Sequence, residues 1–217
     1  MDFITNIPFL LSGLKVTAEL SVASLFFSLI LGMVVALFGL NKSTILRWIS
    51  VAFVELFRNI PSIVQLYWIY YVVPAVWNVI LSPFLSATLA FSMNGGAYVA
   101  EILRGSILAV SKGQWEAARA LGLSEWHMLS RIILPQAARI AIPPIINEVS
   151  RQIKSTSLAS TIALPDLLYV SSSLSSQTFS PTLYITAGAV AYFVLIFPFS
   201  ALSRGIEKSL GKAHLAG

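Results

Sequence analysis

The chain has 217 residues, of which 57% are apolar and only 11% are charged. Soluble domains typically carry about 25% charged residues, so this composition excludes an ordinary soluble protein and predicts a membrane protein. The net charge of +5 does not indicate nucleic-acid binding, because the basic residues flank apolar segments. The chain has no cysteine and two distant histidines, which excludes disulfide bonds and argues against a metal centre.

Five apolar segments are long enough to cross a bilayer, which takes a helix of about 20 residues. The predicted spans cover residues 20–40, 52–74, 84–106, 138–160 and 181–203. Pro74, Asn78 and Pro83 separate the second span from the third. The N-terminal apolar run has no basic segment before it and no cleavage site of the A-x-A type. We therefore expect a retained helix and not a signal peptide.

Lys and Arg gather in residues 42–47, 104–139 and 204–212, whereas the alternate loops carry almost no cations. Because such residues accumulate on the cytoplasmic side, we expect the N-terminus outside and the C-terminus inside. Residues 171–180 are rich in serine and are expected to form a polar external loop or a short surface helix. The sequence thus predicts an all-α membrane protein, a single domain over residues 1–217 with about five transmembrane helices.

Residues 116–135, EAARALGLSEWHMLSRIILP, are helix-prone but much less apolar than the predicted spans. The first six residues favour a helix, and Gly122 can adopt the left-handed conformation that ends one. Ser124 is placed to cap a second short helix. Pro135 lacks an N–H and disfavours a helical Leu134, so we expect a break there. Local chemistry alone is also compatible with an ordinary helix-turn-helix connector.

The same stretch contains Glu-Ala-Ala, three residues, a Gly, nine residues, and then Ile-x-Leu-Pro. This spacing resembles the EAA signature loop of ABC importer permeases in every defined position. In that family the loop docks into a cleft of a separate ATP-hydrolysing subunit. The resemblance implies a cytoplasmic coupling loop at about residues 111–135. The implied coupling residues are Glu116, Ala117, Ala118, Gly122, Leu134 and Pro135.

Three further segments extend the resemblance over nearly the whole chain: 57–74, 94–122 and 153–168. They are similar to the polar amino-acid class of these permeases, which carries histidine, glutamine or arginine. The resemblance implies the type I ABC importer permease fold and a location in the bacterial inner membrane. The implied function is that of a permease subunit, which forms the translocation pathway of an ATP-driven importer.

The implied partners are a second permease chain, identical or homologous, two ABC ATPase subunits and an extracytoplasmic amino-acid-binding protein. The chain contains no G-x-x-x-x-G-K-[ST] motif, so we expect neither a nucleotide site nor an enzymatic activity of its own. ATP would then be bound by the partner subunits, and the chain needs no cofactor.

Glu148, Arg151 and Lys154 follow each other at intervals of three residues in the fourth span. At helical rise Glu148 lies about 14 Å beyond Arg139, near the middle of the bilayer. Ionisable groups at such depth are functional by default. A carboxylate and a guanidinium offer one partner each for the ammonium and carboxylate of an amino acid. The candidate substrate-binding residues are Asn147, Glu148, Arg151, Lys154 and Ser155.

The alternative for Glu148 and Arg151 is a structural ion pair, and the two interpretations are compatible because substrate could displace an internal pair. Pro143-Pro144 is expected to break the backbone hydrogen bonding beside a cavity. Glu55 with Arg58, and Glu101 with Arg104, are expected to form ion pairs near the membrane interface. Two other functions stay open: a secondary transporter or channel, and a structural subunit that recruits an ATPase without transporting anything.

Overall fold

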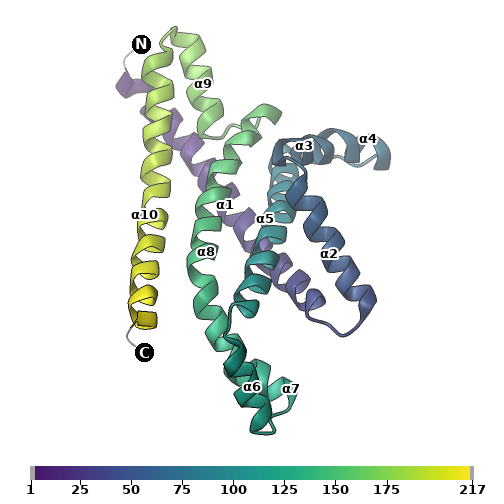
Figure 1. Ribbon diagram of the computed structural model, residues 1–217. Helices are drawn as coiled ribbons and strands as arrows, with labels where there is room; N and C mark the ends of the chain where they lie inside the picture. Colours follow the sequence, from purple (N-terminus) through teal and green to yellow (C-terminus); the bar gives the residue numbers. More distant parts are fainter. Residues whose placement is uncertain (1–2, 216–217) are drawn as a thin grey trace.

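The computed structural model describes residues 3–215, and these residues form only helices and turns, which confirms the all-α prediction (Figure 1). Four long helices make the bundle: α1 (Phe3–Gly39), α5 (Pro83–Leu108), α8 (Leu134–Ser155) and α10 (Pro181–Leu215). The shorter helices are α2 (Thr44–Asn59), α3 (Ser62–Tyr67), α4 (Val73–Trp77), α6 (Lys112–Ala120), α7 (Glu125–Met128) and α9 (Leu167–Thr178). The first and the last described residues lie at opposite ends of the bundle.

Three continuous helical segments are long and apolar enough to cross a membrane: Phe3–Gly39, Glu125–Ile162 and Pro181–Ile206. The first is longer than the predicted span because α1 begins at Phe3. A bent pair, Thr44–Asn59 with Ser62–Trp77, would be a fourth. The 26 residues of α5 are long enough for a fifth. Helix α5 is less apolar because it packs between α1, α8 and α2, where small and polar residues are buried.

The predicted single helix over residues 52–74 is wrong, because the chain turns by 104° between α2 and α3. Pro61 restricts the residue before it, and Ile60 is extended, with φ −90° and ψ 130°. The carbonyls left free at this elbow need partners inside the bundle. The Gln65 amide nitrogen supplies them, donating to the Phe57 oxygen at 2.8 Å and to the Ile60 oxygen at 2.7 Å.

The predicted break at Pro135 is also wrong. Helix runs without interruption from Glu125 to Ile162, and Leu134 is helical with φ −61° and ψ −40°. A π-helical turn, Leu129–Ile133, precedes the proline, and the Gln136 side chain donates to the Ile132 carbonyl at 2.9 Å. Local π geometry and side-chain donors are usual means by which helices tolerate a proline.

Pro143 and Pro144 lie inside α8 without ending it. Neither residue has an N–H to donate, so each leaves a gap in the backbone hydrogen bonding of the helix, as predicted, and the cavity expected beside them stays a prediction. Pro143 is buried against α10, where the Ser203 hydroxyl donates to the Pro143 carbonyl at 3.3 Å. Neighbouring helices can satisfy backbone groups around a proline in a bundle. The prolines therefore lie at a contact between α8 and α10.

The serine-rich segment was expected to form either an external loop or a short surface helix. It forms a short helix, α9, but one side of this helix is buried. Ser171, Leu174 and Ser175 are buried, whereas Ser172 and Ser176 are exposed. Helix α9 packs on α1 and α10. The serines on its inner side are small enough for this close packing, which explains a polar composition in a partly buried helix.

The closest packing in the bundle joins α1, α5 and α8. Ser28 of α1 and Gln152 of α8 meet over Gly95 of α5, and the Gln152 amide nitrogen donates to the Ser28 oxygen at 3.0 Å. Small residues allow helix backbones to approach this closely, and the polar contact then replaces the hydrogen bonds lost to water. This junction fixes the position of α8, which carries the charged residues.

We predict that Gly95→Ala destabilises the protein, because a β-carbon at Gly95 would lie 2.5 Å from the Gln152 side-chain oxygen. Overpacking of this kind costs about 1–3 kcal/mol and should lower Tm by several degrees. Gly105→Ala is the matched control on the same helix, since nothing lies within 4 Å of its added β-carbon. It should leave Tm unchanged or raise it slightly, because alanine favours a helix by about 1 kcal/mol. Equal thermal stability of the two purified variants would contradict the close-packed junction.

Candidate functional site

A helical hairpin of α6 and α7 projects from the end of the bundle where the described chain also ends (Figure 1). Gly122 has φ +70°, which confirms the left-handed turn predicted between the two helices. Ser124 is the N-cap of α7, as predicted, and its hydroxyl oxygen accepts from the His127 backbone N–H. The hairpin therefore follows from local sequence chemistry.

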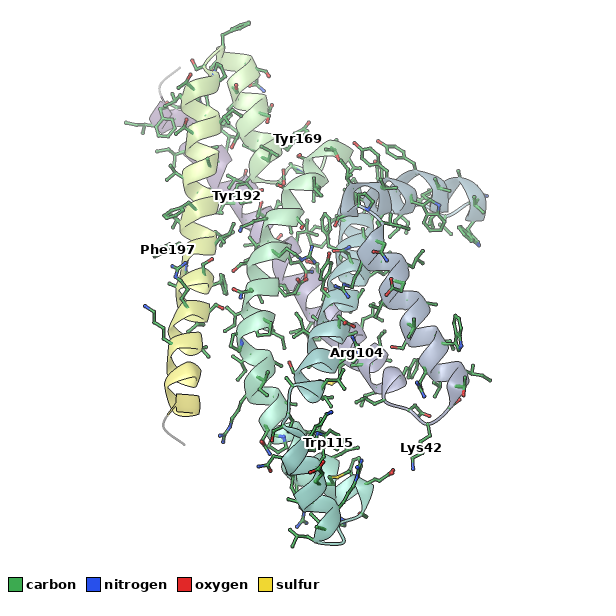
Figure 2. All side chains as sticks on the ribbon, in the orientation of Figure 1. Lys42, Arg104, Trp115, Tyr169, Tyr192 and Phe197 are labelled. Atoms are coloured by element: carbon green, nitrogen blue, oxygen red, sulfur yellow. The ribbon has the colours of Figure 1, made fainter. Side chains whose placement is uncertain are left out.

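The hairpin has a small core of its own. Ala118 is 1% exposed and packs with Val110, Met128 and Ile133. Trp115 covers the same cluster and is visible within the hairpin in Figure 2. Because a methyl group fits this position, Ala118 serves the stability of the hairpin itself.

The remaining motif residues lie on the surface: Glu116, Ala117, Gly122, Leu134 and Pro135. Three large apolar residues at the turn are exposed as well, with Leu121 at 76%, Trp126 at 72% and Leu123 at 38%. The sequence analysis did not predict these three as contact residues, although exposed apolar residues in a polar loop can indicate a protein-binding surface. An exposed apolar tip beside an exposed carboxylate is suited to contact another protein.

The turn between α1 and α2 reaches the hairpin through one ion pair. The Lys42 ammonium lies 2.7 Å from the Glu125 carboxylate of α7 (Figure 2). This hydrogen-bonded contact raises the pKa of Lys42. Both side chains are exposed, so the pair contributes little to the stability of the fold.

The second candidate site lies on α8 within the bundle. Glu148 is 5% exposed, and both of its oxygens accept from the Arg151 guanidinium, at 2.7 and 2.6 Å. This is the bidentate ion pair that was one of the two sequence-based alternatives. Breaking such a buried pair by removing one partner costs about 3–5 kcal/mol.

Two residues of α5, which sequence reasoning missed, complete this cluster. The Asn94 side-chain oxygen accepts from Arg151 at 3.0 Å, and its nitrogen donates to the Phe57 carbonyl at the elbow at 2.8 Å. The Arg151 guanidinium lies 4.1 Å from the centre of the Tyr98 ring. The signal was the spacing of Asn94 and Tyr98, which places them one turn apart on one face of α5.

The other predicted substrate residues do not join this cluster. Lys154 is exposed, and it lies about 120° around α8 from Glu148 because the two are six residues apart. Asn147 is also exposed. Ser155 is partly buried, and its hydroxyl donates to the Arg151 carbonyl within the same helix. Of the five, Glu148 and Arg151 are in direct side-chain contact.

A second group of charges lies on α2 and α5. The Arg104 guanidinium donates to both oxygens of Glu101, at 2.9 and 2.5 Å, which confirms that predicted pair (Figure 2 labels Arg104). The predicted Glu55–Arg58 pair is wrong. Arg58 instead lies 3.9 Å from Glu101 and 5.3 Å from the Tyr98 ring centre. Glu55 accepts a hydrogen bond from Asn59.

We call these residues the charged strip: Glu148, Arg151, Asn94, Tyr98, Arg58, Glu101 and Arg104. The side chains of Arg151 and Arg58 are 33% and 37% exposed. Charges exposed to lipid at this depth would cost several kcal/mol, so intramembrane charges face water or protein. The strip therefore identifies a surface of the bundle that does not face lipid.

Comparison with known proteins agrees with these features. Residues 28–212 match the family described as binding-protein-dependent transport system inner membrane components. The L-cystine transport system permease protein TcyB of Bacillus subtilis (strain 168) is 41% identical over 207 residues, covering 94% of this chain and 88% of TcyB. The putative glutamine transport system permease protein GlnP of Rickettsia conorii is 34% identical over 210 residues, covering 97% and 96%.

Solved structures share the fold. The crystal structure of an amino acid ABC transporter with histidines contains a chain that superposes with a TM-score of 0.90 at 29% identity, covering 96% of this chain and 99% of the other. A chain of the MetNI methionine ABC transporter in an inward-facing conformation gives a TM-score of 0.73 at 17% identity, covering 95% and 99%. The second match supports the fold alone.

Proposed function

We infer the role of this chain from the premise that it belongs to the family of binding-protein-dependent transport system inner membrane components. It is a multi-pass inner-membrane protein with the type I fold, the permease subunit of an amino-acid ABC importer. Hydrolysis of ATP takes place on separate subunits. A secondary transporter is thereby set aside, since those proteins are usually built from internal repeats that this chain lacks.

The observation that carries this function is the coincidence of the EAA motif with the projecting hairpin. The hairpin offers Glu116 and an apolar tip to the outside, while Ala118 keeps its two helices together. We propose that this surface docks on an ATPase subunit, with the exposed motif residues at the contact. Because helix is continuous from Glu125 to Ile162, movement of the hairpin reaches the membrane segment directly.

A complete importer is proposed to contain a second permease chain, two ATPase subunits that bind ATP, and an external amino-acid-binding protein. The partly exposed charges of Arg58 and Arg151 support a second permease chain, because they need a partner or a shared aqueous path in the membrane. Closure of the ATPase pair on ATP would draw two hairpins together, and rigid-body movement of the helices would alternate access to the path.

We predict that Gly122→Val abolishes coupling without unfolding the chain. A β-branched residue is strained at φ +70°, although nothing lies within 4 Å of an added β-carbon, so only the turn is disturbed. In Gly122→Val, ATP-dependent uptake of L-glutamine or L-cystine into vesicles should fall by at least about tenfold. The uptake by the complex without substitutions should be insensitive to an uncoupler, because ATP and not an ion gradient drives it. Glu116→Lys should weaken co-purification of the ATPase, because it reverses an exposed charge.

Gly113→Val is the matched control, since Gly113 also has free space but an ordinary helical φ. It should retain most of the uptake. Full uptake by both Gly122→Val and Glu116→Lys would disprove docking through the hairpin.

We also propose that the hairpin and the C-terminus are cytoplasmic and the N-terminus is external. The distribution of cations supports this orientation, as does the position of the hairpin opposite the N-terminal end (Figure 1). The chain has no cysteine, so single cysteines can report the side. Ala120→Cys in the hairpin should react with an impermeant thiol reagent only from the cytoplasm, and Ser176→Cys on the exposed side of α9 only from outside. Reversed labelling would invert the proposed topology.

The Glu148–Arg151 pair is proposed as the centre of the substrate site for polar amino acids. Arg151 can exchange a carboxylate of the protein for that of the substrate, which frees Glu148 for the ammonium group. Asn94 and Tyr98 hold the guanidinium in place during this exchange. Lys154, Asn147 and Ser155 remain candidates only for contacts made in another conformation or with the second chain.

We predict that Glu148→Gln and Arg151→Gln each reduce the yield of assembled complex. Arg151→Gln leaves the buried Glu148 carboxylate unpaired, at a cost of about 3–5 kcal/mol. Glu148→Gln leaves the partly exposed Arg151 guanidinium without its carboxylate, so its effect should be smaller. The double variant Glu148→Gln/Arg151→Gln should recover assembly and yet fail to import substrate. Assembly is measured by size-exclusion chromatography and import by radiolabelled uptake. Normal import by the assembled double variant would show that the pair is purely structural.

A further inference from the structure

The charged strip continues beyond the Glu148–Arg151 pair toward the hairpin end of the bundle. Asn94, Tyr98 and Glu101 follow at intervals of four and three residues, so they lie on one face of α5. At helical rise they extend over about 10 Å along the helix axis. The first of these residues contacts Arg151, and the last carries the second group of charges.

Tyr98 connects the two groups through its ring. The guanidinium carbon of Arg151 lies 4.1 Å from the ring centre and that of Arg58 lies 5.3 Å from it. The two carbons are therefore at most 9.4 Å apart, whichever faces of the ring they occupy. The carboxylate of a substrate that leaves the Arg151 guanidinium therefore has to move less than 10 Å to reach that of Arg58.

Arg58 differs from the other arginines of the strip in how its N–H groups are used. Arg151 donates to Glu148 and Asn94, and Arg104 donates twice to Glu101. The Arg58 nitrogen nearest Glu101 is 3.9 Å away, which is beyond hydrogen-bond range. Among the residues whose side chains the structure describes (3–206 and 208), the Arg58 side chain makes no hydrogen bond, so its planar set of donors is free for another acceptor.

We propose that Arg58, beside Tyr98, is a second station for the carboxylate of the transported amino acid, between the Glu148–Arg151 pair and the hairpin end. The ligand class is the zwitterion of an α-amino acid, held by a bidentate contact to the guanidinium. Glu101 lies next to Arg58 and provides negative charge for the ammonium group. This inference rests on the proposed function, since it extends the route of the same substrate.

A station on the exit side has a kinetic signature that a central site does not share. Removal of Arg58 should slow passage from the central pair, while capture of substrate from outside is unaffected. In Arg58→Gln the maximal uptake rate should fall about tenfold, and the half-saturating external concentration should stay within about twofold. A cation–π contact that only holds α2 against α5 would change stability instead.

Arg104→Gln is the matched control, because Arg104 is the other partner of Glu101 and does not contact the Tyr98 ring. All variants are tested in the complex with its ATPase subunits and binding protein, reconstituted in vesicles with radiolabelled L-glutamine or L-cystine. Arg104→Gln should keep its maximal rate within about twofold. The station is disproved if Arg58→Gln keeps the normal maximal rate, if it raises the half-saturating concentration, or if Arg104→Gln loses as much activity.

A second readout is inhibition by the same amino acid added on the side of the ATPase subunits. Occupation of the station from that side should slow uptake, and Arg58→Gln should raise the half-inhibiting concentration about tenfold. A structural role for Arg58 would leave this concentration unchanged. If Arg58→Gln does not assemble, Arg58→Lys decides, because it keeps the charge and loses the planar fork. An unchanged half-inhibiting concentration in Arg58→Lys then disproves the station.

The complex without substitutions separates this inference from the proposed function. If it takes up no amino acid, the proposed function fails and the station fails with it. If it imports normally while Arg58→Gln matches it in both readouts, only the station is disproved.

Discussion

The structure depends on one constraint, that polar groups inside a bilayer must find their partners within the protein. At the elbow between α2 and α3 this requirement is met by Gln65, whose amide nitrogen binds the two carbonyls freed by Pro61. Near Pro135, on the exposed surface of the hairpin, a π-helical turn and Gln136 serve the same purpose. In both places a side-chain amide donates to a backbone carbonyl, which allows sharp or strained geometry.

The same constraint governs the charges. Glu148 can be buried only because Arg151 binds both of its oxygens, and Arg151 is in turn held by Asn94 and Tyr98. Stability and substrate exchange therefore use the same groups. A substrate zwitterion that replaces one partner must satisfy every group that it releases, since an unpaired charge in this setting costs several kcal/mol. This requirement favours ligands that carry both a carboxylate and an ammonium group.

The sequence predicted the features that local chemistry decides. Gly122 and Ser124 define the hairpin through backbone conformation and capping, and neither depends on distant residues. The elbow at Pro61 was not foreseen, because the stabilising amide of Gln65 acts across the break. Asn94 and Tyr98 were missed because their partner lies on α8, 57 residues away from Asn94. The position of Lys154 required the helix rotation as well as the spacing, and spacing alone had suggested a common face.

The uninterrupted helix from Glu125 to Ile162 contains both Trp126 of the hairpin tip and Glu148 of the charged pair. Each residue inserted into a continuous helix rotates one end relative to the other by about 100° about the helix axis. A π-helical turn is the trace of a single extra residue in an α-helix, and here it lies between Trp126 and Glu148. The rotational phase of the docking surface relative to the charged pair is therefore set by residue count. Relatives with this geometry should not tolerate a single insertion or deletion in residues 129–133.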